Sequence, residues 1–369
     1  MSSATGLHIL HDTGAPAGSN DYTTLVLLHG YIWHSEIFRP LLPLARTHNA
    51  RILCVNRRGY PGARPYTPAE RAPLEHPPGP GAPLAEVAAF RARVAAFYRE
   101  RGRELHALLL ELAQGGLPKA DRGRNRGGIV VLGWSFGTTW MHAMLADVAA
   151  FDAEAGSEID LGDYVRRVVL YEPLVALAGY PPPRDAYNPF ADPAVVIEEQ
   201  QELLMNWISG YFLHGPDFSD IDTLERRQHL PVPRPTLTTM SVETVGDVTH
   251  APAGSPGGAD HTILQAGLMA NVYPKLRERM LRLPAEKRED GKMWEHVEVR
   301  VVWGDMSIWE SPGAVMYFKK ELEDAKKRGI RMRSVTFARV RGANHLAHWD
   351  FPEKTLRAIL GTSAETELE

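Results

Sequence analysis

Short runs of apolar and β-branched residues alternate with longer stretches of helical periodicity along most of the chain. Six runs predict strands, at residues 23–29, 50–55, 127–133, 165–171, 297–303 and 333–340. These runs are apolar at consecutive positions, which is typical of strands covered on both faces and therefore of a parallel sheet. Residues 84–114 and 138–151 carry helical periodicity and predict helices. This alternation predicts an α/β fold.

The alternation of strand and helix stops between residues 174 and 292. This part contains helical patterns, such as residues 194–212, but no strong strand pattern. We therefore expect a core formed by residues 1–173 and 293–369, with a helical insertion at 174–292. Four large side chains recur at helical spacing in the insertion, namely Met205, Trp207, Tyr211 and Phe212. We expect them mainly to pack the insertion onto the core, with one or two also lining a pocket.

The composition is that of a globular protein with a sizeable core, since 44% of its 369 residues are hydrophobic and 23% are charged. A formal net charge of -4 gives no electrostatic reason to bind nucleic acid or an anionic membrane. We therefore expect a small-molecule substrate as the partner, while the oligomeric state stays open. Cys54 is the single cysteine, which favours a reducing compartment. With no signal peptide or membrane span in the sequence, a cytoplasmic location is expected.

Residues 133–137 read GWSFG and stand directly between a predicted strand and a predicted helix. In a G-x-S-x-G pattern the two glycines allow a sharp turn that exposes the serine hydroxyl above the sheet. Ser135 is therefore a candidate nucleophile. The backbone N–H of Phe136, at the start of the helix, is a candidate oxyanion donor. Tyr31, which follows His29 and Gly30 at the end of the first run, is the candidate for a second donor.

Four motifs follow one another along the chain: His29-Gly30, the stretch NRRGYPG at 56–62, GWSFG at 133–137 and GANH at 342–345. In this order and spacing they resemble the α/β-hydrolase superfamily, in the branch that carries a helical cap. The resemblance covers nearly the whole core. It implies an α/β-hydrolase fold with a mostly parallel central sheet, a Ser-acid-His triad beneath a cap at 174–292, and neither a metal nor an organic cofactor. Asn56 stands where the family carries Asp, a position outside the triad.

The residue type of the candidate nucleophile limits the reactions that the site is expected to catalyse. Ser135 stands where haloalkane dehalogenases and epoxide hydrolases of this branch carry Asp, which argues against both of those reactions. The expected function is hydrolysis of a carboxylic ester or lactone of a moderately apolar small molecule through an acyl-enzyme. Two alternatives remain: the same triad acting on a thioester, a small peptide or a carbon–carbon bond, and a ligand-binding protein without turnover.

Two histidines lie close together after the last predicted strand. His345 is three residues past Gly342, where the resemblance places the general base of the triad. His348 is expected to pack or to line the pocket entrance. A metal site at this pair is not expected, because the H-E-x-x-H pattern and an evident third ligand are both absent from the sequence.

The acid of the triad is where the sequence departs most from the family. The usual position, three residues after Gly304, holds Ser307, which has no carboxylate. Glu172 directly follows the run at 165–171, where some members of this branch carry the acid. Asp305 and Glu310 lie near the usual position without being in register with it. The pattern favours Glu172, with Asp305 and then Glu310 as alternatives.

Overall fold

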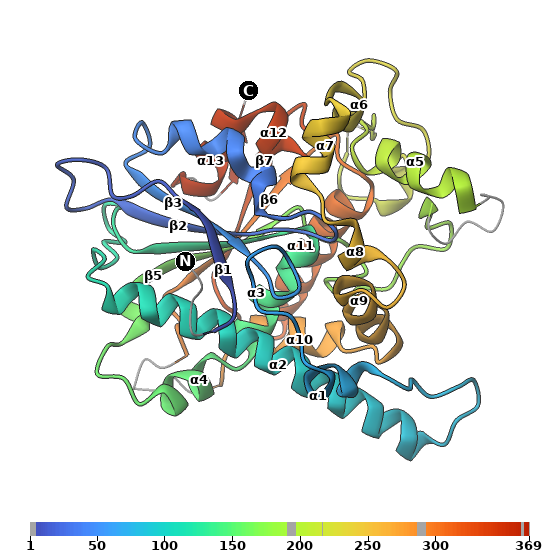
Figure 1. Ribbon diagram of the computed structural model, residues 1–369, viewed down its shortest axis with the longest axis horizontal. Coiled ribbons are helices and arrows are strands. Elements are labelled where there is room, and N and C mark those ends of the chain that lie inside the picture. The colour runs from blue at the N-terminus through green and yellow to red at the C-terminus, as the bar shows by residue number, and fades with distance from the viewer. Residues whose placement is uncertain (1–4, 190–196, 216, 286–292, 363–364, 369) are drawn as a thin grey trace.

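An eight-stranded sheet forms the centre of the computed structural model, which describes residues 5–189, 197–215, 217–285, 293–362 and 365–368. The strand order is β1-β3-β2-β4-β5-β6-β7-β8. Seven strands run parallel, and β1 pairs antiparallel with β3 at one edge. The predicted α/β-hydrolase fold with a mostly parallel sheet is confirmed (Figure 1). The strands are β1 His8–Asp12, β2 Thr23–Leu28, β3 Ala50–Asn56, β4 Ile129–Trp134, β5 Val165–Tyr171, β6 Glu298–Gly304, β7 Val335–Val340 and β8 Glu365–Leu368.

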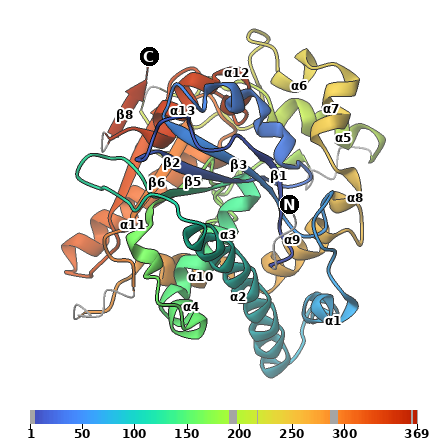
Figure 2. The same cartoon turned by 60° about the vertical axis from the view of Figure 1, so that its left-hand side comes forward.

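Successive residues of each central strand face opposite layers. In β2, Leu25 and Leu27 pack in one buried cluster, whereas Val26 and Leu28 pack in the other. This follows from the two-residue period of a strand. Both clusters exclude solvent, which explains why the central strands are largely apolar on both of their faces. Helices lie above and below the sheet in Figure 2.

The helices divide between the two faces of the sheet. One face carries α2 Leu84–Gln114, α3 Thr138–Ala146, α10 Tyr273–Leu281 and α11 Glu310–Lys327, and the other carries the 3-10 helix η1 Ser35–Leu44, α12 Ala347–Asp350 and α13 Pro352–Leu360. Shorter elements are α1 Pro68–Arg71, η2 Ala72–Leu74, η3 Ser135–Gly137, α4 Val148–Ala155, η4 Leu161–Asp163 and η6 Ile221–Thr223. Among the helices in the described ranges, none has both the length and the apolar character needed to cross a membrane.

The predicted helix at 84–114 is present as α2, and Gly102 lets it approach α3 closely. A Cβ added to Gly102 would lie 2.6 Å from the backbone carbonyl carbon of Ala143, so only glycine fits without a shift. The predicted helix at 138–151 differs from the structure. It is divided at Asp147 into α3 and α4.

The chain between β5 and β6 folds into helices joined by loops and turns, and its described residues include no strand. It contains α5 Ile197–Ile208, α6 Thr236–Thr239, α7 Val242–Val248, α8 Ala251–Gly254, α9 Ala259–Met269 and α10. Helices α5 to α9 gather on one side of the sheet, at the right of Figure 1, while α10 lies under the sheet beside α3. Three parts of the expected insertion, residues 190–196, 216 and 286–292, lie outside the described residues.

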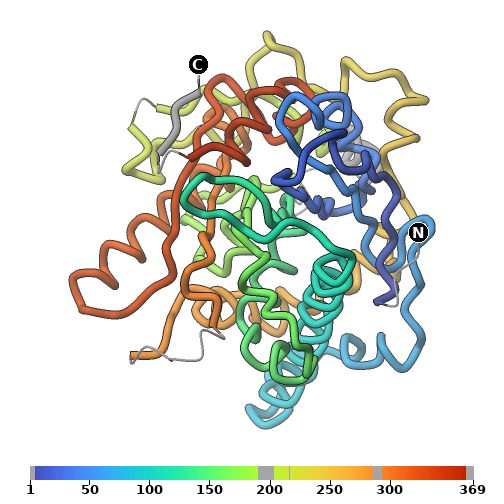
Figure 3. Tube along the Cα trace, turned by 90° about the vertical axis from the view of Figure 1, so that its left-hand side faces the viewer, coloured from blue at the N-terminus to red at the C-terminus, as the bar shows by residue number. Residues whose placement is uncertain are grey.

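Two strands were not predicted from the sequence. β1 has only two apolar residues among five and lies half-exposed at the edge of the sheet. β8 reads ETEL and forms the opposite edge. Figure 3 shows the two ends of the chain on opposite sides of the view, as this topology requires. Edge strands carry a weak hydrophobic pattern because one side is open to solvent.

Candidate active site

Ser135 occupies a tight turn between β4 and α3. Its φ of +53° lies in the left-handed region that non-glycine residues seldom adopt. The flanking glycines make the turn sterically feasible. A Cβ on Gly133 would lie 2.3 Å from the carbonyl oxygen of Gly137, and a Cβ on Gly137 would lie 2.7 Å from that of His29. The turn therefore has the form expected of a nucleophile elbow.

His345 follows β7 and is fixed on two sides. Its Nδ1 lies 2.9 Å from Oε2 of Glu172, and its backbone carbonyl accepts a hydrogen bond of 3.1 Å from the indole N–H of Trp134. A carboxylate beside Nδ1 requires a proton on that nitrogen, so a neutral ring has Nε2 free to accept one. The side chain is buried. The arrangement suits a general base.

Glu172 is completely buried at the end of β5, where it also has a left-handed φ of +53°. Its Oε1 accepts the backbone N–H of Gly304 at 2.5 Å, and its Oε2 accepts the hydroxyl of Ser307 at 2.5 Å as well as the ring of His345. Three donors therefore compensate the buried carboxylate. Ser307 occupies the position where the family usually carries its acid, and here it donates to the carboxylate from the neighbouring strand.

The second acid candidate, Asp305, is engaged elsewhere. Its Oδ2 forms an ion pair with Arg339 at 2.8 Å, and its Oδ1 accepts the backbone N–H of Gly342 at 2.7 Å. Within the described part of the chain, no hydrogen bond joins Asp305 to His345. These contacts stabilise the turn that leads from β7 to His345.

The third candidate, Glu310, is the first residue of α11 and is only 6% exposed. Burial raises the pKa of its carboxyl to about 7, although the backbone N–H of Ala176 acts in the opposite direction. Among the described residues, Glu172 is thus the one of the three carboxylates that hydrogen-bonds His345.

The loop after β2 lies directly against the elbow. A Cβ on Gly30 would lie 3.2 Å from Cβ of Ser135, so this loop passes the candidate nucleophile in close contact. The ring of Tyr31 meets the ring of Phe136 edge to face, with centroids 6.1 Å apart. The backbone N–H groups of these two residues remain the candidate oxyanion donors.

His29 is buried and fixes the start of this loop. Its Nδ1 donates to the carbonyl of Gly30 at 3.0 Å, and its Nε2 accepts the backbone N–H of Arg57 at 3.1 Å. Burial and the charge of Arg57 hold the pKa of His29 well below its usual range, so the ring is neutral. Its contacts are those of a structural residue.

Asp260, in α9, ties the insertion to the same loop, a link that sequence reasoning missed. Both its oxygens pair with the buried guanidinium of Arg57, at 2.7 and 2.8 Å, and it also accepts the hydroxyl of Tyr60 and the backbone N–H of Ile32. Arg57 in turn donates to the carbonyl of Gly30 at 2.8 Å. Arg57 and Asp260 are 203 residues apart in the sequence, so no local sequence pattern predicts this ion pair.

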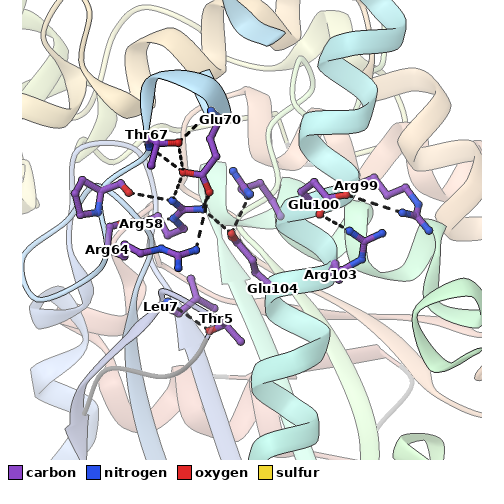
Figure 4. A network of polar contacts seen from close by, with 12 residues as sticks. Thr5, Leu7, Arg58, Arg64, Thr67, Glu70, Arg99, Glu100, Arg103 and Glu104 are labelled. Carbon is purple, nitrogen blue, oxygen red and sulfur yellow. Dashed lines mark hydrogen bonds and ion pairs between the residues drawn. The ribbon is translucent and has the colours of Figure 1, made fainter. Parts of the chain in front are cut away.

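The neighbouring Arg58 anchors the same turn from its other side. Figure 4 shows its guanidinium between Glu70 and Glu104, with nitrogen–oxygen distances of 2.6 and 2.8 Å. Glu104 also pairs with Arg101. The turn after β3 therefore contains two adjacent arginines with separate carboxylate partners.

A cavity of about 150 Å³ connects the elbow with the insertion. Its lining is mainly apolar and includes both Ser135 and His345. The lining residues are Tyr31, Ile32, Trp33, Ser135, Phe136, Leu174, Ala176, Leu177, Asn188, Leu204, Met205, Trp207, Ile208, Leu264, Leu268, Ile308, Glu310 and His345. Of the four large side chains singled out in the insertion, Met205 and Trp207 line this cavity. Tyr211 hydrogen-bonds Asp350 instead, and Phe212 is buried.

His348 is buried beneath the site. Its Nδ1 lies 3.2 Å from the hydroxyl of Tyr171, and its ring packs against Trp134 and Phe38. Burial, together with the neighbouring His345, lowers the pKa of His348 well below its usual range. Its contacts are those of a packing residue. In the described ranges, no three His, Cys, Asp or Glu side chains gather as metal ligands would.

Several solved structures are similar to this chain at low sequence identity. A bromoperoxidase from Bacillus anthracis is 14% identical, with 95% of this chain and 92% of that chain covered and a TM-score of 0.42. A mutant epoxide hydrolase from Solanum tuberosum is 14% identical over 97% and 96%, with a TM-score of 0.45. A carboxylesterase from Bacillus subtilis is 16% identical over 94% and 86%, with a TM-score of 0.41.

The search of curated proteins finds no match. A model of the Alpha/beta hydrolase family matches residues 25–358, which is most of the chain. The chain therefore belongs to the alpha/beta hydrolase family.

Proposed function

We propose that the protein is a serine hydrolase that cleaves a carboxylic ester or lactone of a moderately apolar small molecule. The observation that carries the proposal is the contact of 2.9 Å between His345 Nδ1 and Glu172 Oε2, in a cavity that Ser135 also lines. A serine on a strained turn, a histidine and a buried carboxylate are the three parts that acyl transfer requires. The apolar lining supports a substrate that is itself largely apolar.

In the proposed reaction, Ser135 Oγ attacks the carbonyl carbon while His345 Nε2 takes the hydroxyl proton. The backbone N–H groups of Tyr31 and Phe136 stabilise the oxyanion, and Glu172 stabilises the imidazolium. Collapse of the tetrahedral intermediate breaks the bond to the alcohol oxygen, which receives the proton from His345. Water then attacks the acyl carbon while His345 Nε2 takes one of its protons. Collapse of this second intermediate breaks the bond to Ser135 Oγ, which receives that proton, and the carboxylic acid leaves.

The insertion at residues 174–292 is proposed to act as a cap over this site. More than half of the residues lining the cavity come from it, Met205, Trp207 and Leu264 among them. Asp260 also joins the insertion to the loop that carries Tyr31. Such a cap would exclude water from the acyl-enzyme until the alcohol has left.

A fluorophosphonate probe tests the nucleophile without knowledge of the substrate. The wild type should be labelled on Ser135, and Ser135→Ala should not be labelled, whereas the exposed Ser255→Ala should react like the wild type. A panel of esters and lactones of graded size then tests the bond type. Absence of labelling in the wild type would contradict the proposal and favour a ligand-binding protein without turnover.

A further inference from the structure

Glu310 is a carboxyl group in the wall of an otherwise apolar cavity. Its side chain is 6% exposed, and it lines the same space as Ser135 and His345. In the described part of the chain, neither a cationic side chain nor a hydroxyl hydrogen-bonds it. The proposed reaction uses Glu172 as its acid, so Glu310 has no role in it.

Other buried carboxylates in this protein have internal partners. Asp260 is neutralised by Arg57, and Glu172 receives three hydrogen bonds, including one from His345. Burying a carboxylate without such partners is costly. Glu310 therefore differs from them, because the cavity lining contains neither lysine nor arginine. The backbone N–H of Ala176 favours the charged form of Glu310, and a cation that enters the cavity would add the positive charge that the lining lacks.

The rest of the lining suits a cation as well. The aromatic residues Tyr31, Trp33, Phe136 and Trp207 also line this cavity. The faces of such rings attract a positive charge, most strongly when water is excluded. A carboxyl group together with several aromatic rings is a lining that favours an ammonium group over a neutral polar group.

The titration of Glu310 agrees with this arrangement. Burial raises the pKa of Glu310 to about 7, so near neutral pH the carboxyl can hold or release its proton at little cost. An ammonium group beside it would favour the charged form and lower that pKa again.

We propose that Glu310 is a specificity-determining residue that recognises a protonated amine, so that the substrate is an ester or lactone carrying a basic nitrogen. This inference rests on the proposed function, because the amine must belong to a molecule whose carbonyl reaches Ser135. Glu310 binds the cationic group by a charge-assisted hydrogen bond, and the surrounding rings contact the rest of it.

Matched pairs of para-nitrophenyl and alkyl esters test the proposal. One member of each pair carries a terminal amine and the other carries a methyl group at the same place. The amine is placed in the acyl part in one series and in the alcohol part in the other, and each series includes several chain lengths. The wild type should prefer an amine-bearing ester by at least about tenfold in kcat/KM, the least that one charge-assisted hydrogen bond provides. Glu310→Gln should lose this preference, measured as the ratio of kcat/KM between the two members of each pair. Glu323→Gln, at an exposed position of the same helix, is the control and should keep it.

The pH dependence of the preference is a second readout. Glu310 must be ionised to pair with the amine, so the preference should rise with pH between about 5 and 8, as Glu310 ionises. The other titratable groups lining the cavity are His345 and Tyr31. His345 acts as the base for both members of a pair, so its contribution cancels in the ratio of their kcat/KM values. Burial raises the pKa of Tyr31 to about 12, which is above the pH range of the experiment.

The outcomes separate the two proposals. Equal rates for amine-bearing and neutral esters in both series, or a preference that persists in Glu310→Gln, would overturn the amine site and leave the hydrolase intact. If no ester is cleaved and Ser135 is not labelled, the hydrolase fails instead. Calorimetric titration with hexylammonium, with hexanol as the neutral probe, then decides the amine site. Binding that is about tenfold weaker in Glu310→Gln supports it, and equal binding contradicts it.

Discussion

The hydroxyl of Ser307 donates a hydrogen bond of 2.5 Å to Oε2 of Glu172. The end of β6, where the family usually carries its acid, thus supports a carboxylate that comes from the end of β5. The same oxygen lies 2.9 Å from Nδ1 of His345. The ends of β5 and β6 are therefore close enough for a carboxylate at either one to accept a hydrogen bond from His345 Nδ1.

Replacing Glu172 with Gln should lower kcat by about ten-thousandfold, because the amide keeps the shape but favours the wrong tautomer of His345. Asp305→Asn should keep kcat close to that of the wild type, since Asp305 pairs with Arg339. Steady-state kinetics on an ester that the wild type cleaves measures both. If Asp305→Asn loses activity and Glu172→Gln retains it, Asp305 is the acid.

The acid should be transferable between the two strand ends. Glu172→Ala combined with Ser307→Asp places a carboxylate at the end of β6, one hydrogen bond from the original position. The kcat of this double variant should be at least about tenfold higher than that of Glu172→Ala, because the effects of substitutions at two interacting positions do not simply add. Ser307→Asp alone should gain nothing, because two adjacent carboxylates repel each other. A double variant no faster than Glu172→Ala would show that an acid at 307 does not serve His345.

Asp260→Asn should affect both stability and catalysis. It leaves the buried Arg57 without its counter-charge, so the free energy of unfolding should fall by about 3–5 kcal/mol, and kcat should fall because the loop carrying Tyr31 is less well held. Glu104→Gln removes a partner of Arg58 on the far side of the turn. This control should lower stability less and leave kcat unchanged. Urea denaturation and kinetics on both variants separate the effects, and equal loss of kcat in the two would contradict a positioning role for Asp260.

Two helical glycines should respond oppositely to alanine. Gly102→Ala brings a Cβ to 2.6 Å from the backbone of Ala143 and should destabilise the fold by about 1–3 kcal/mol, as overpacking does. Gly246 lies in α7 with no heavy atom within 4 Å of an added Cβ. Gly246→Ala should therefore stabilise by about 0.5–1 kcal/mol. Urea denaturation of both variants tests this, and the same sign for both would contradict the close packing of α2 on α3.

Stability should depend on pH through Glu310. Its pKa rises from 4.5 to about 7 on folding, so between these values the folded chain holds a proton that the unfolded chain releases. This contribution is fully present below pH 4.5 and is lost as pH rises through 7. Relative to Glu310→Gln, the wild type should thus lose about 3 kcal/mol of unfolding free energy between pH 4 and 8. A constant difference between the two proteins would show that Glu310 titrates normally.

The central strands could be predicted because they are buried on both faces and are therefore rich in apolar, β-branched residues. β1 and β8 could not, since an edge strand needs few apolar residues and its identity depends on the neighbour with which it pairs. The break at Asp147 was missed for a similar reason: helical periodicity continues through it, and packing decides where α3 ends.

In the site, Ser135 and His345 could be proposed from local motifs, because a strained turn and a strand end leave a recognisable sequence pattern. The acid could only be narrowed to Glu172, Asp305 and Glu310. The contacts that distinguish them, such as the hydrogen bond from Ser307 to Glu172, join residues 135 positions apart. The role of Asp260 could not be predicted from the sequence, because a single aspartate in a helical pattern is typical of a solvent-exposed position and its partner Arg57 is distant in the chain.

The pair of Arg57 and Asp260 also restricts how the protein can be re-engineered. Exchanging the helices between β5 and β6 for those of another hydrolase is an obvious route to a chimera with a new pocket. Such an exchange removes Asp260 and leaves a guanidinium buried without a counter-charge beside the loop that carries Tyr31. A chimera junction placed after α9 therefore has to restore a carboxylate at this point, or replace Arg57 by an uncharged residue in the same step.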